Sequence, residues 1–549
     1  DDAMRDFHQP GRSPVIAANG LCATSHPLAA ATAVRVLEEG GNAVDAAVAV
    51  GLTLGVVDGH NSGIGGGCFM LIRRANGEFI ALDGREIAPA AATRDMFLRD
   101  GKADVQLSQT GPLASGIPGS VAIYEHAVKQ FGRRTFADAL QPGIAIAEQG
   151  FPITGIYASR LRDCAAELAK FPGSRAVLFR EGRPLQKGEV LRQPDLAATY
   201  RALAEQGSGW FYRGPFAETV ARWMREHGGI LTAEDFARYE LKVREPIRTR
   251  YRGHEIVSFP PPSSGGVHVA QMLNILEHFD LGALDEATRR HVLAEAMKLA
   301  FADRAHWLGD PDFVKVPRGL VSSDYAAALA ARIQVERAST VAAHGTPPRA
   351  GEDVFGDRHT THFSVADAEG NWVACTATVN TGFGSKVIVP GTGVILNNQM
   401  DDFSLQPGVA NYFGLVGAEA NAIAPGKRPL SSMSPTIVLK DGQPVMAIGA
   451  AGGPRIITAV LQCLVGLLDL NQSPAEALAA PRLHQQWSPN ELLVEKTLPP
   501  ALREALIARG HSIREVSGGS SVHVVTRLSS SPGFSGAADP RGDGTAAGF

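Results

Sequence analysis

A hairpin pattern past the middle of the chain constrains the fold most. It consists of two alternating runs, "TTHFSVAD" and "WVACTATVN", separated by the turn sequence "AEGN". Such a pattern predicts two antiparallel strands joined by a short loop. With residues 368–370 as the loop, Asp367 faces Asn371. The same register places Thr360 opposite Thr378, and a slip by one residue would turn both side chains to the other face of the sheet.

The two threonines that open the hairpin stand between two histidines, His359 and His362. Histidines three residues apart point to opposite faces of a strand, so they cannot bind one metal ion together. The chain also lacks an HExxH motif, and its five cysteines form no CxxC pair. We therefore expect no metal site, no cofactor and no disulfide framework.

A threonine hydroxyl becomes a nucleophile when a neighbouring amine takes its proton, and cleavage of the chain before the threonine supplies such an amine. This chemistry needs an exposed segment, then the threonine, then a strand that fixes the new terminus. Residues 338–358 are polar and rich in glycine and proline, and Thr360 and the predicted strand follow them. Thr378 and Asn380 share one strand face and would lie around that terminus. An ordinary strand threonine remains the alternative, because threonine is common in strands.

Composition excludes several classes of protein. The chain has 549 residues and a net charge of −4 with both signs interspersed, so we expect no basic face for nucleic acid. Its length suggests two or more lobes, or one large α/β unit. The longest apolar run, residues 46–57, is too short to span a bilayer and predicts a buried helix. No signal-peptide pattern is visible and the first residue is aspartate, so the compartment stays open.

Two helical patterns and a glycine run come first along the chain. Residues 25–41 and 42–57 predict helices, the first with Pro27 at its start and the second capped by Asn42. The glycine run at residues 63–67 leads into a strand and has no GK[ST] after it. It therefore predicts close approach of the backbone and not a phosphate loop.

Further helices and strands are predicted beyond this run. The dipeptide Asn76-Gly77 predicts the turn of another hairpin. Amphipathic helical patterns dominate residues 115–340. Past the first hairpin, "GVIL" at residues 393–396 predicts a strand, and "PRIITAVLQCLVGLLDL" predicts a helix.

Three other stretches carry polar residues or glycines where apolar residues are expected. Residues 397–404 contain amides and carboxylates, residues 427–436 contain adjacent serines, and residues 449–455 contain consecutive glycines before a helix. Successive backbone N–H groups at a helix start can form an oxyanion hole. Taken singly, each stretch is better explained as a loop or a cap.

Together these stretches resemble the γ-glutamyltransferase family of N-terminal-nucleophile (Ntn) hydrolases. The motifs run in order through most of the chain and include "GGNAVDAAVAVG", "LDGREIAPAAATRDMF", "PPPSSGG", "TTHFSV", "NNQMDDFS", "PGKRPLSSMSPTIV" and "GAAGGPRIIT". The resemblance implies an α+β fold, a four-layer αββα sandwich. It also implies a precursor that cuts itself between His359 and Thr360. The large subunit, residues 1–359, and the small subunit, residues 360–549, would stay together as one sandwich.

The resemblance implies a role for each motif residue. Thr360 would be the nucleophile of self-cleavage and of turnover, its α-amine the general base, and Thr378 its hydrogen-bond partner. Gly452 and Gly453 match the family's oxyanion hole. The other matches form a pocket for the γ-glutamyl group, with Arg85, Ser431 and Ser432 for its α-carboxylate, and Asp402, Asn380 and Gln399 for its α-ammonium.

With these roles, the implied activity is acyl transfer. Thr360 would take the γ-glutamyl group of glutathione or a related amide and pass it to water or to an amino acid or peptide. Residues 407–417 resemble the lid loop of bacterial members, with Phe413 where a lid tyrosine is common and Tyr412 beside it. The family resemblance further implies a periplasmic or secreted enzyme.

Two other functions stay open. Residues 5–30 and 58–69 look more like acylases of the same superfamily that remove glutaryl or cephalosporin side chains. Asp402 favours the γ-glutamyl substrate, because a glutaryl group has no α-ammonium to pair with this carboxylate. The remaining alternative is a non-catalytic binding relative, which would keep an uncut chain.

Overall fold

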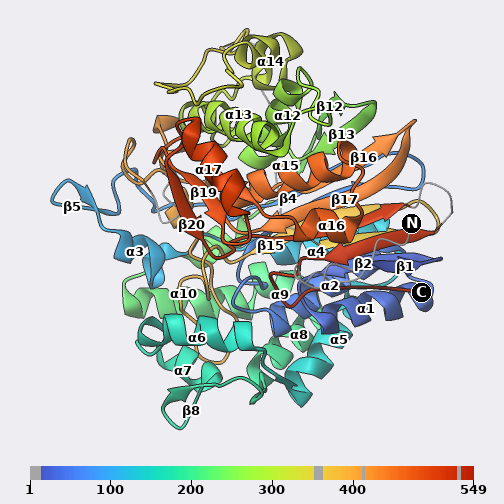
Figure 1. The fold of residues 1–549 in the computed structure, drawn as a ribbon. Helices are drawn as coiled ribbons and strands as arrows, with labels where there is room; N and C mark the ends of the chain where they lie inside the picture. Colours follow the sequence, from blue (N-terminus) through green and yellow to red (C-terminus); the bar gives the residue numbers. More distant parts are fainter. Residues whose placement is uncertain (1–13, 352–362, 411–414, 528–532) are drawn as a thin grey trace.

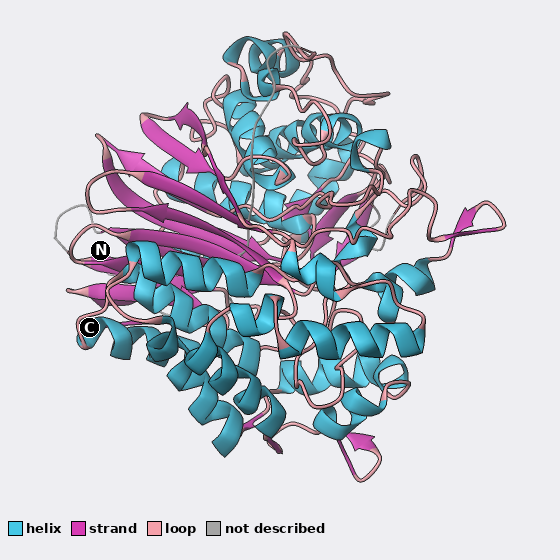
Figure 2. Cartoon of the chain, turned by 180° about the vertical axis from the view of Figure 1, so that it is seen from behind, coloured by secondary structure: helices cyan, strands magenta, loops and turns pink. Residues whose placement is uncertain are grey.

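The computed structural model describes residues 14–351, 363–410, 415–527 and 533–549. Two antiparallel sheets of seven strands lie face to face, and helices cover both outer faces, as Figure 1 and Figure 2 show. The layers follow the order helix, sheet, sheet, helix, so the predicted four-layer α+β sandwich is confirmed.

Both sheets combine strands from the two ends of the chain. The first sheet has the order β1 (Val15–Ala17), β22 (Phe534–Ala538), β21 (Ser521–Arg527), β17 (Gln443–Ala451), β16 (Thr436–Lys440), β13 (His254–Ser258) and β12 (Ile247–Tyr251). The second has the order β11 (Lys242–Arg244), β4 (Phe79–Gly84), β3 (Gly67–Arg73), β15 (Trp372–Thr378), β14 (Phe363–Asp367), β2 (Gly20–Thr24) and β23 (Thr545–Gly548). In each sheet, strands from before residue 352 are hydrogen-bonded to strands from after residue 362. Each sheet therefore needs both halves of the chain.

Apolar side chains join the two sheets. Trp372 of β15 is fully buried and packs against Phe534 of β22, with 5.8 Å between the ring centroids. Since these strands belong to different sheets, the contact bridges the two inner layers. β15 also lies against β17 of the facing sheet. The ends of these two central strands carry predicted site residues, so the packing of the sheets brings those residues together.

Helices form the outer layers (Figure 1). The second sheet is covered by α1 (Pro27–Glu38), α2 (Ala43–Val57) and α4 (Ser120–Phe131). Beyond them lies a helical lobe with α5 (Phe136–Gln149), α6 (Gly155–Leu168), α7 (Pro172–Leu178), α8 (Pro194–Gln206), α9 (Gly209–Tyr212), α10 (Pro215–His227) and α11 (Ala233–Ala237). The first sheet is covered by α12 (Ser264–Leu276), α15 (Arg455–Leu468) and α16 (Pro474–Ala479), with α13 (Glu286–Trp307), α14 (Ser323–Ala330) and α17 (Pro500–Ala508) outside them.

The first two helices begin as predicted. His26 is the N-cap of α1, and Pro27 is the first residue of that helix. Asn42 caps α2 in a capping box, because Asn42 Oδ1 accepts from Asp45 N at 3.1 Å while Asn42 N donates to Asp45 Oδ2 at 2.9 Å. Nearly every residue of α2 is buried, and its small side chains let it pack closely between α1, α5 and the sheet.

The predicted register of the central hairpin is confirmed for the described residues. β14 and β15 pair in that register over residues 363–366, and Asp367 N donates to Asn371 O at 3.1 Å in the turn. Thr360 lies outside the described residues, so its place opposite Thr378 stays a prediction.

The strand prediction for residues 393–396 is wrong. These residues form a loop, in which Ile395 makes an isolated bridge with Ile388. The backbone here is held by side chains and by loop segments instead of by a ladder. Asn397 Nδ2, for example, donates to Gly65 O at 2.8 Å and to Gly116 O at 2.9 Å. Val394 and Leu396 are buried and Ile395 is partly buried. A short apolar run does not by itself distinguish a strand from a buried loop.

Candidate active site

A cavity of about 580 Å³ lies at the ends of β15 and β17. Its lining includes nine predicted site residues, namely Arg85, Thr378, Asn380, Gln399, Asp402, Ser431, Ser432, Gly452 and Gly453. Segments far apart in the sequence thus meet at one place. The remaining two predicted site residues, His359 and Thr360, lie outside the described residues. Tyr412 and Phe413 of the expected lid loop also lie outside them.

The end of β15 supplies Thr378 and Asn380. Thr378 Oγ1 accepts a hydrogen bond from Asn380 N at 2.8 Å. Asn380 adopts a left-handed backbone conformation with φ of 86°, which asparagine tolerates better than most residues. Its Nδ2 atom donates to Asn398 O at 3.1 Å. This turn keeps a hydroxyl and an amide side by side at the cavity.

The glycine run before β3 lets the backbone approach this strand end closely. A Cβ atom on Gly66 would lie 1.9 Å from Thr378 O, and one on Gly65 would lie 1.9 Å from Ile395 O. Real Cβ atoms do not come so near to backbone oxygens. The predicted close approach is therefore confirmed, and it places the loop at residues 63–67 directly behind the cavity wall.

Arg85 and Asp402 form an ion pair in the cavity wall. Arg85 follows β4 and is only 1% exposed, and its Nη2 atom donates to Asp402 Oδ2 at 2.7 Å. The same guanidinium donates from Nε to Pro429 O at 3.0 Å and from Nη2 to Leu430 O at 2.7 Å. Burial raises the pKa of Asp402, and the nearby Arg85 charge opposes this rise. The two anchors predicted for opposite ends of a zwitterion pair with each other in this structure.

The loop that carries Asp402 is held by amide side chains. Gln399 and Asp402 are the ends of a single 3-10 turn, and Gln399 Nε2 donates to Asp402 Oδ2. Asn421 Nδ2 donates to Asp402 O at 2.8 Å, while Asn421 Oδ1 accepts from Leu430 N at 3.0 Å. The stretch at residues 397–404 is therefore polar because its side chains fix the cavity wall.

Ser431 and Ser432 lie against the start of α12. Ser431 N donates to Pro262 O at 2.8 Å, and Ser431 O accepts from Ser264 N at 2.7 Å. The turn with sequence "PPPSSGG" therefore positions the two predicted carboxylate-binding serines through its backbone. Ser432 Oγ accepts a hydrogen bond from Arg304 Nη2 at 3.0 Å.

Gly452 and Gly453 connect β17 to α15. Their φ values are 132° and 60°, in the region that favours glycine. A Cβ atom on Gly452 would also lie 2.2 Å from Gly519 O. Among the described residues, no backbone carbonyl accepts a hydrogen bond from either N–H group. Two such N–H groups beside a helix start suit an oxyanion.

Sequence reasoning missed Arg304 of α13. This side chain is buried and lines the same cavity as the predicted residues. Burial lowers its pKa to about 10, and the charge of Arg85 adds to this effect while Asp402 opposes it. The sequence carried no signal for this role, because residues 286–307 read as an amphipathic helix. The structure shows that Lys298, Asp303 and Arg304 of this helix are all buried.

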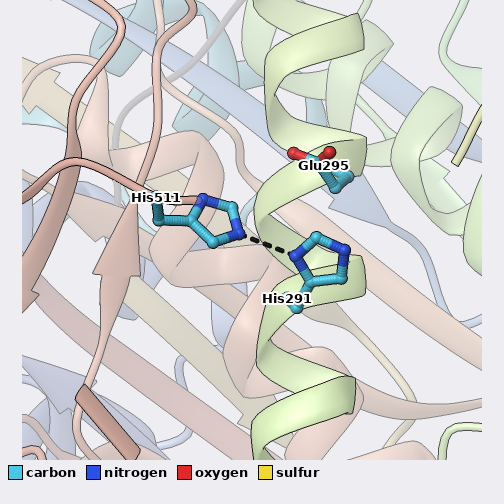
Figure 3. A group of neighbouring side chains, drawn as sticks. All are labelled: His291, Glu295 and His511. Atoms are coloured by element: carbon cyan, nitrogen blue, oxygen red, sulfur yellow. Dashed lines mark hydrogen bonds between the residues drawn. The ribbon is translucent and has the colours of Figure 1, made fainter. Parts of the chain in front are cut away.

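A histidine and glutamate cluster lies outside this cavity. His291 and Glu295 of α13 and His511, which follows α17, are buried together (Figure 3). His291 Nδ1 and His511 Nε2 are 2.7 Å apart, and His291 Nε2 lies 2.6 Å from Gln334 O. Lys298 Nζ lies 2.7 Å from Glu295 Oε2. Protein partners therefore already occupy these groups, and the lysine charge opposes a cation there.

Comparisons with known proteins find relatives that match most of the chain. A Gamma-glutamyltranspeptidase family profile matches residues 29–549. The "Glutathione hydrolase proenzyme" of Escherichia coli (strain K12) is 46% identical over 506 residues, which are 91% of this chain and 87% of that protein. The "Acylase ACY 1 proenzyme" of Pseudomonas sp. (strain SE83) is 40% identical over 513 residues, which are 91% of this chain and 88% of that protein.

Solved structures show the same fold. The cephalosporin acylase from Bacillus halodurans has a TM-score of 0.88 at 31% identity, and the match covers 100% of this chain and 99% of that chain. The Helicobacter pylori gamma-glutamyltranspeptidase has a TM-score of 0.56 at 39% identity, and the match covers 63% of this chain and 97% of that chain.

A four-layer αββα sandwich, with a polar cavity where central strands of both sheets end, defines an Ntn-hydrolase-type enzyme. The chain belongs to the gamma-glutamyltranspeptidase family. The predicted family and enzyme class are thereby confirmed. None of the described helices is long and apolar enough to cross a membrane.

Proposed function

We propose that the chain is a γ-glutamyltransferase that acts as a glutathione hydrolase. It transfers the γ-glutamyl group of glutathione, or of a related amide, to water or to an amino acid or peptide. The observation that carries this proposal is the buried pair of Arg85 and Asp402 in the cavity that also holds Ser431 and Ser432. A substrate with an α-carboxylate and an α-ammonium can pair with both charges at once. The name of the Escherichia coli relative, a glutathione hydrolase, supports the same substrate.

In the proposed cycle, Thr360 is the nucleophile. Its hydroxyl oxygen attacks the γ-carbonyl carbon of the donor while its α-amine takes the hydroxyl proton. The N–H groups of Gly452 and Gly453 stabilise the oxyanion. The C–N bond breaks, the leaving amine takes the proton, and a γ-glutamyl ester remains on Thr360. Water, or the amine of an acceptor, then attacks this ester and restores the threonine hydroxyl.

The proposal includes maturation by self-cleavage between His359 and Thr360. The products are a large subunit, residues 1–359, and a small subunit, residues 360–549. Two observations support it. The relatives from Escherichia coli and Pseudomonas carry the word proenzyme in their names. The strands of both halves are interleaved in both sheets, so strand pairing would hold the two fragments together after cleavage. By resemblance we place the enzyme in the periplasm or outside the cell, which cell fractionation would test.

A second candidate function is the removal of glutaryl or cephalosporin side chains from amides. Two relatives favour it, namely the Pseudomonas acylase and the Bacillus halodurans cephalosporin acylase, whose structure matches the whole chain. The charge at Asp402 argues against it. A glutaryl group would leave this buried carboxylate without a substrate partner, and a buried charge that loses its partner is costly.

The cleavage can be tested on a denaturing gel with N-terminal sequencing. Purified protein should give two bands, and the smaller one should begin Thr-Thr-His-Phe-Ser. Thr360→Ala should leave one full-length band, whereas Thr361→Ala should still be cut. A wild-type chain that stays whole on long incubation would refute the maturation step.

The substrate can be tested with three p-nitroanilides that differ only in the acyl end. The γ-glutamyl anilide carries both α-groups, the glutaryl anilide lacks the ammonium, and the 4-aminobutyryl anilide lacks the carboxylate. We expect the highest kcat/KM for the γ-glutamyl anilide. Faster release of glutarate than of glutamate would select the acylase function.

A further inference from the structure

A second buried arginine stands behind the proposed carboxylate-binding serines. Arg304 lies near the C-terminal end of α13 and is 5% exposed. It lines the same cavity as Ser431, Ser432 and Arg85. Its guanidinium divides between two hydroxyls, because Nε donates to Ser264 Oγ at 2.8 Å and Nη2 donates to Ser432 Oγ at 3.0 Å.

These hydrogen bonds fix the direction of the hydroxyl protons. A guanidinium has donors only, so both serine oxygens accept from it. Ser264 Oγ donates a hydrogen bond to Ser431 O at 2.6 Å. Ser432 has no such acceptor among the described residues, so its hydroxyl hydrogen remains available for a group in the cavity. Arg304 thus makes Ser432 a donor toward the cavity, which is what a carboxylate needs.

The charges of the cavity wall point the same way. Arg85 and Asp402 neutralise each other as an ion pair, and Arg304 adds a positive charge close to both. This extra charge favours an anionic group beside Ser432. It gives no help to an ammonium, which has to rely on Asp402.

Resting on the proposed function, we infer that Arg304 is a positioning residue for the α-carboxylate of the donor. It holds Ser432 in the donor orientation, and its charge strengthens the carboxylate site from behind. Arg85 then contacts the substrate carboxylate directly, whereas Arg304 acts on it through Ser432.

The test compares Arg304→Gln with wild type on the three p-nitroanilides. We expect KM for the γ-glutamyl and glutaryl anilides to rise roughly 10- to 100-fold, the effect of losing a hydrogen bond to a charged group, with kcat within a few-fold. For the 4-aminobutyryl anilide, which has no α-carboxylate, we expect less than about threefold change in kcat/KM. Arg304→Lys keeps the charge but cannot bridge both serines, so its effect should be intermediate.

Two controls separate this role from simple support of the fold. Arg290→Gln removes another buried arginine of α13. Arg290 does not line the cavity, and its Nη1 atom donates to Pro481 O at 2.9 Å. It should leave the ratio between the three anilides unchanged. Ser432→Ala should mimic Arg304→Gln, and the double variant should be little worse than either single one.

The outcomes distinguish this inference from the proposed function. If wild type fails to turn over the γ-glutamyl anilide, the proposed function is wrong. If wild type does so but Arg304→Gln loses activity equally on all three anilides, or loses kcat at unchanged KM, the positioning role is overturned. Should Arg304→Gln fail to fold or mature, Arg304→Lys decides the question by the same ratio.

Discussion

At the scale of single residues, the ion pair between Arg85 and Asp402 shows how a site can be complete before the substrate arrives. Each charge is satisfied by the other, and backbone carbonyls hold the guanidinium in place. On the proposed function, a zwitterionic substrate would offer one partner for each member, so binding would exchange partners without leaving a buried charge alone. A substrate with only one of the two charges cannot do this.

Asp402→Asn should therefore change the substrate preference. The neutral amide keeps the shape of the side chain but no longer attracts an ammonium. We expect KM for the γ-glutamyl anilide to rise roughly 10- to 100-fold, as for loss of a hydrogen bond to a charged group. The glutaryl anilide should be affected far less, and the two KM values measured on one preparation give the comparison. Equal losses on both anilides would contradict the role of Asp402.

Asp58 should make the stability of the protein depend on pH. Burial raises its pKa to about 7, while hydrogen bonds from Asn61 and Ser25 oppose this rise. His60 Nε2 lies 3.4 Å from Asp58 Oδ1, but the imidazole stays neutral because burial lowers its pKa to about 3. Because the pKa of Asp58 is higher in the folded protein than in the unfolded chain, its protonated carboxyl adds to the free energy of unfolding at low pH. This contribution is lost as the pH rises through 7.

The measurement compares Tm of wild type and Asp58→Asn between pH 5 and pH 8. We expect the difference in Tm, wild type minus variant, to fall over this range, because only wild type must ionise a buried carboxyl. A difference that is constant or that rises with pH would show that Asp58 is ionised in the folded protein throughout.

At the scale of elements, the contact between the glycine run and β15 positions the end of the central hairpin. Gly66→Ala would force a Cβ atom to within 1.9 Å of Thr378 O. Because backbone on both sides must move, we expect a loss of about 1–3 kcal/mol in stability and roughly a tenfold or greater fall in kcat/KM. Gly63→Ala in the same run is the matched control, since its nearest neighbour would be 3.8 Å away. Thermal unfolding and anilide turnover of both variants test this, and equal behaviour would contradict it.

The same elements show what the sequence can and cannot predict. The hairpin at residues 363–378 was predictable because its alternation, its turn and its length agree with one another. The loop at residues 393–396 was not, because its backbone is bound by Asn397 and by segments far away in the sequence. Local patterns carry no information on such partners.

The candidate site also has a part that the sequence predicts and a part that it does not. Arg85, Asp402 and the two serines could be identified from motifs, whereas their pairing could not, since it depends on the relative placement of loops. Arg304 lies in a helix whose sequence reads as amphipathic. Only the packing of α13 over α12 turns this side chain toward the cavity.

At the scale of the whole molecule, the two halves on either side of residues 352–362 share both sheets. β14 lies between β15 and β2, and β13 pairs with β16. The histidine cluster adds a further link, because His511 contacts His291 (Figure 3). Strand pairing, the two-sheet core and this buried contact all cross the same boundary.

The cut protein should therefore behave as one particle in native buffer. We expect size-exclusion chromatography to give one peak at the size of the 57.9 kDa chain, or a multiple of it, with both fragments in a fixed ratio. The fragments should separate only in denaturant. A small fragment that elutes by itself in native buffer would contradict the shared sheets as the source of cohesion.

The interleaved strands also change the molecularity of refolding once the bond has been cut. The intact precursor can regain its sheets in a first-order reaction, because one chain supplies every strand. The cleaved enzyme can regain them only when two fragments meet, so its recovery after unfolding depends on concentration and competes with aggregation of exposed strand edges. The lifetime of the cleaved enzyme is then governed by the rate at which it first unfolds. The peptide bond between the two halves assists folding of the precursor, and after cleavage it can no longer assist refolding.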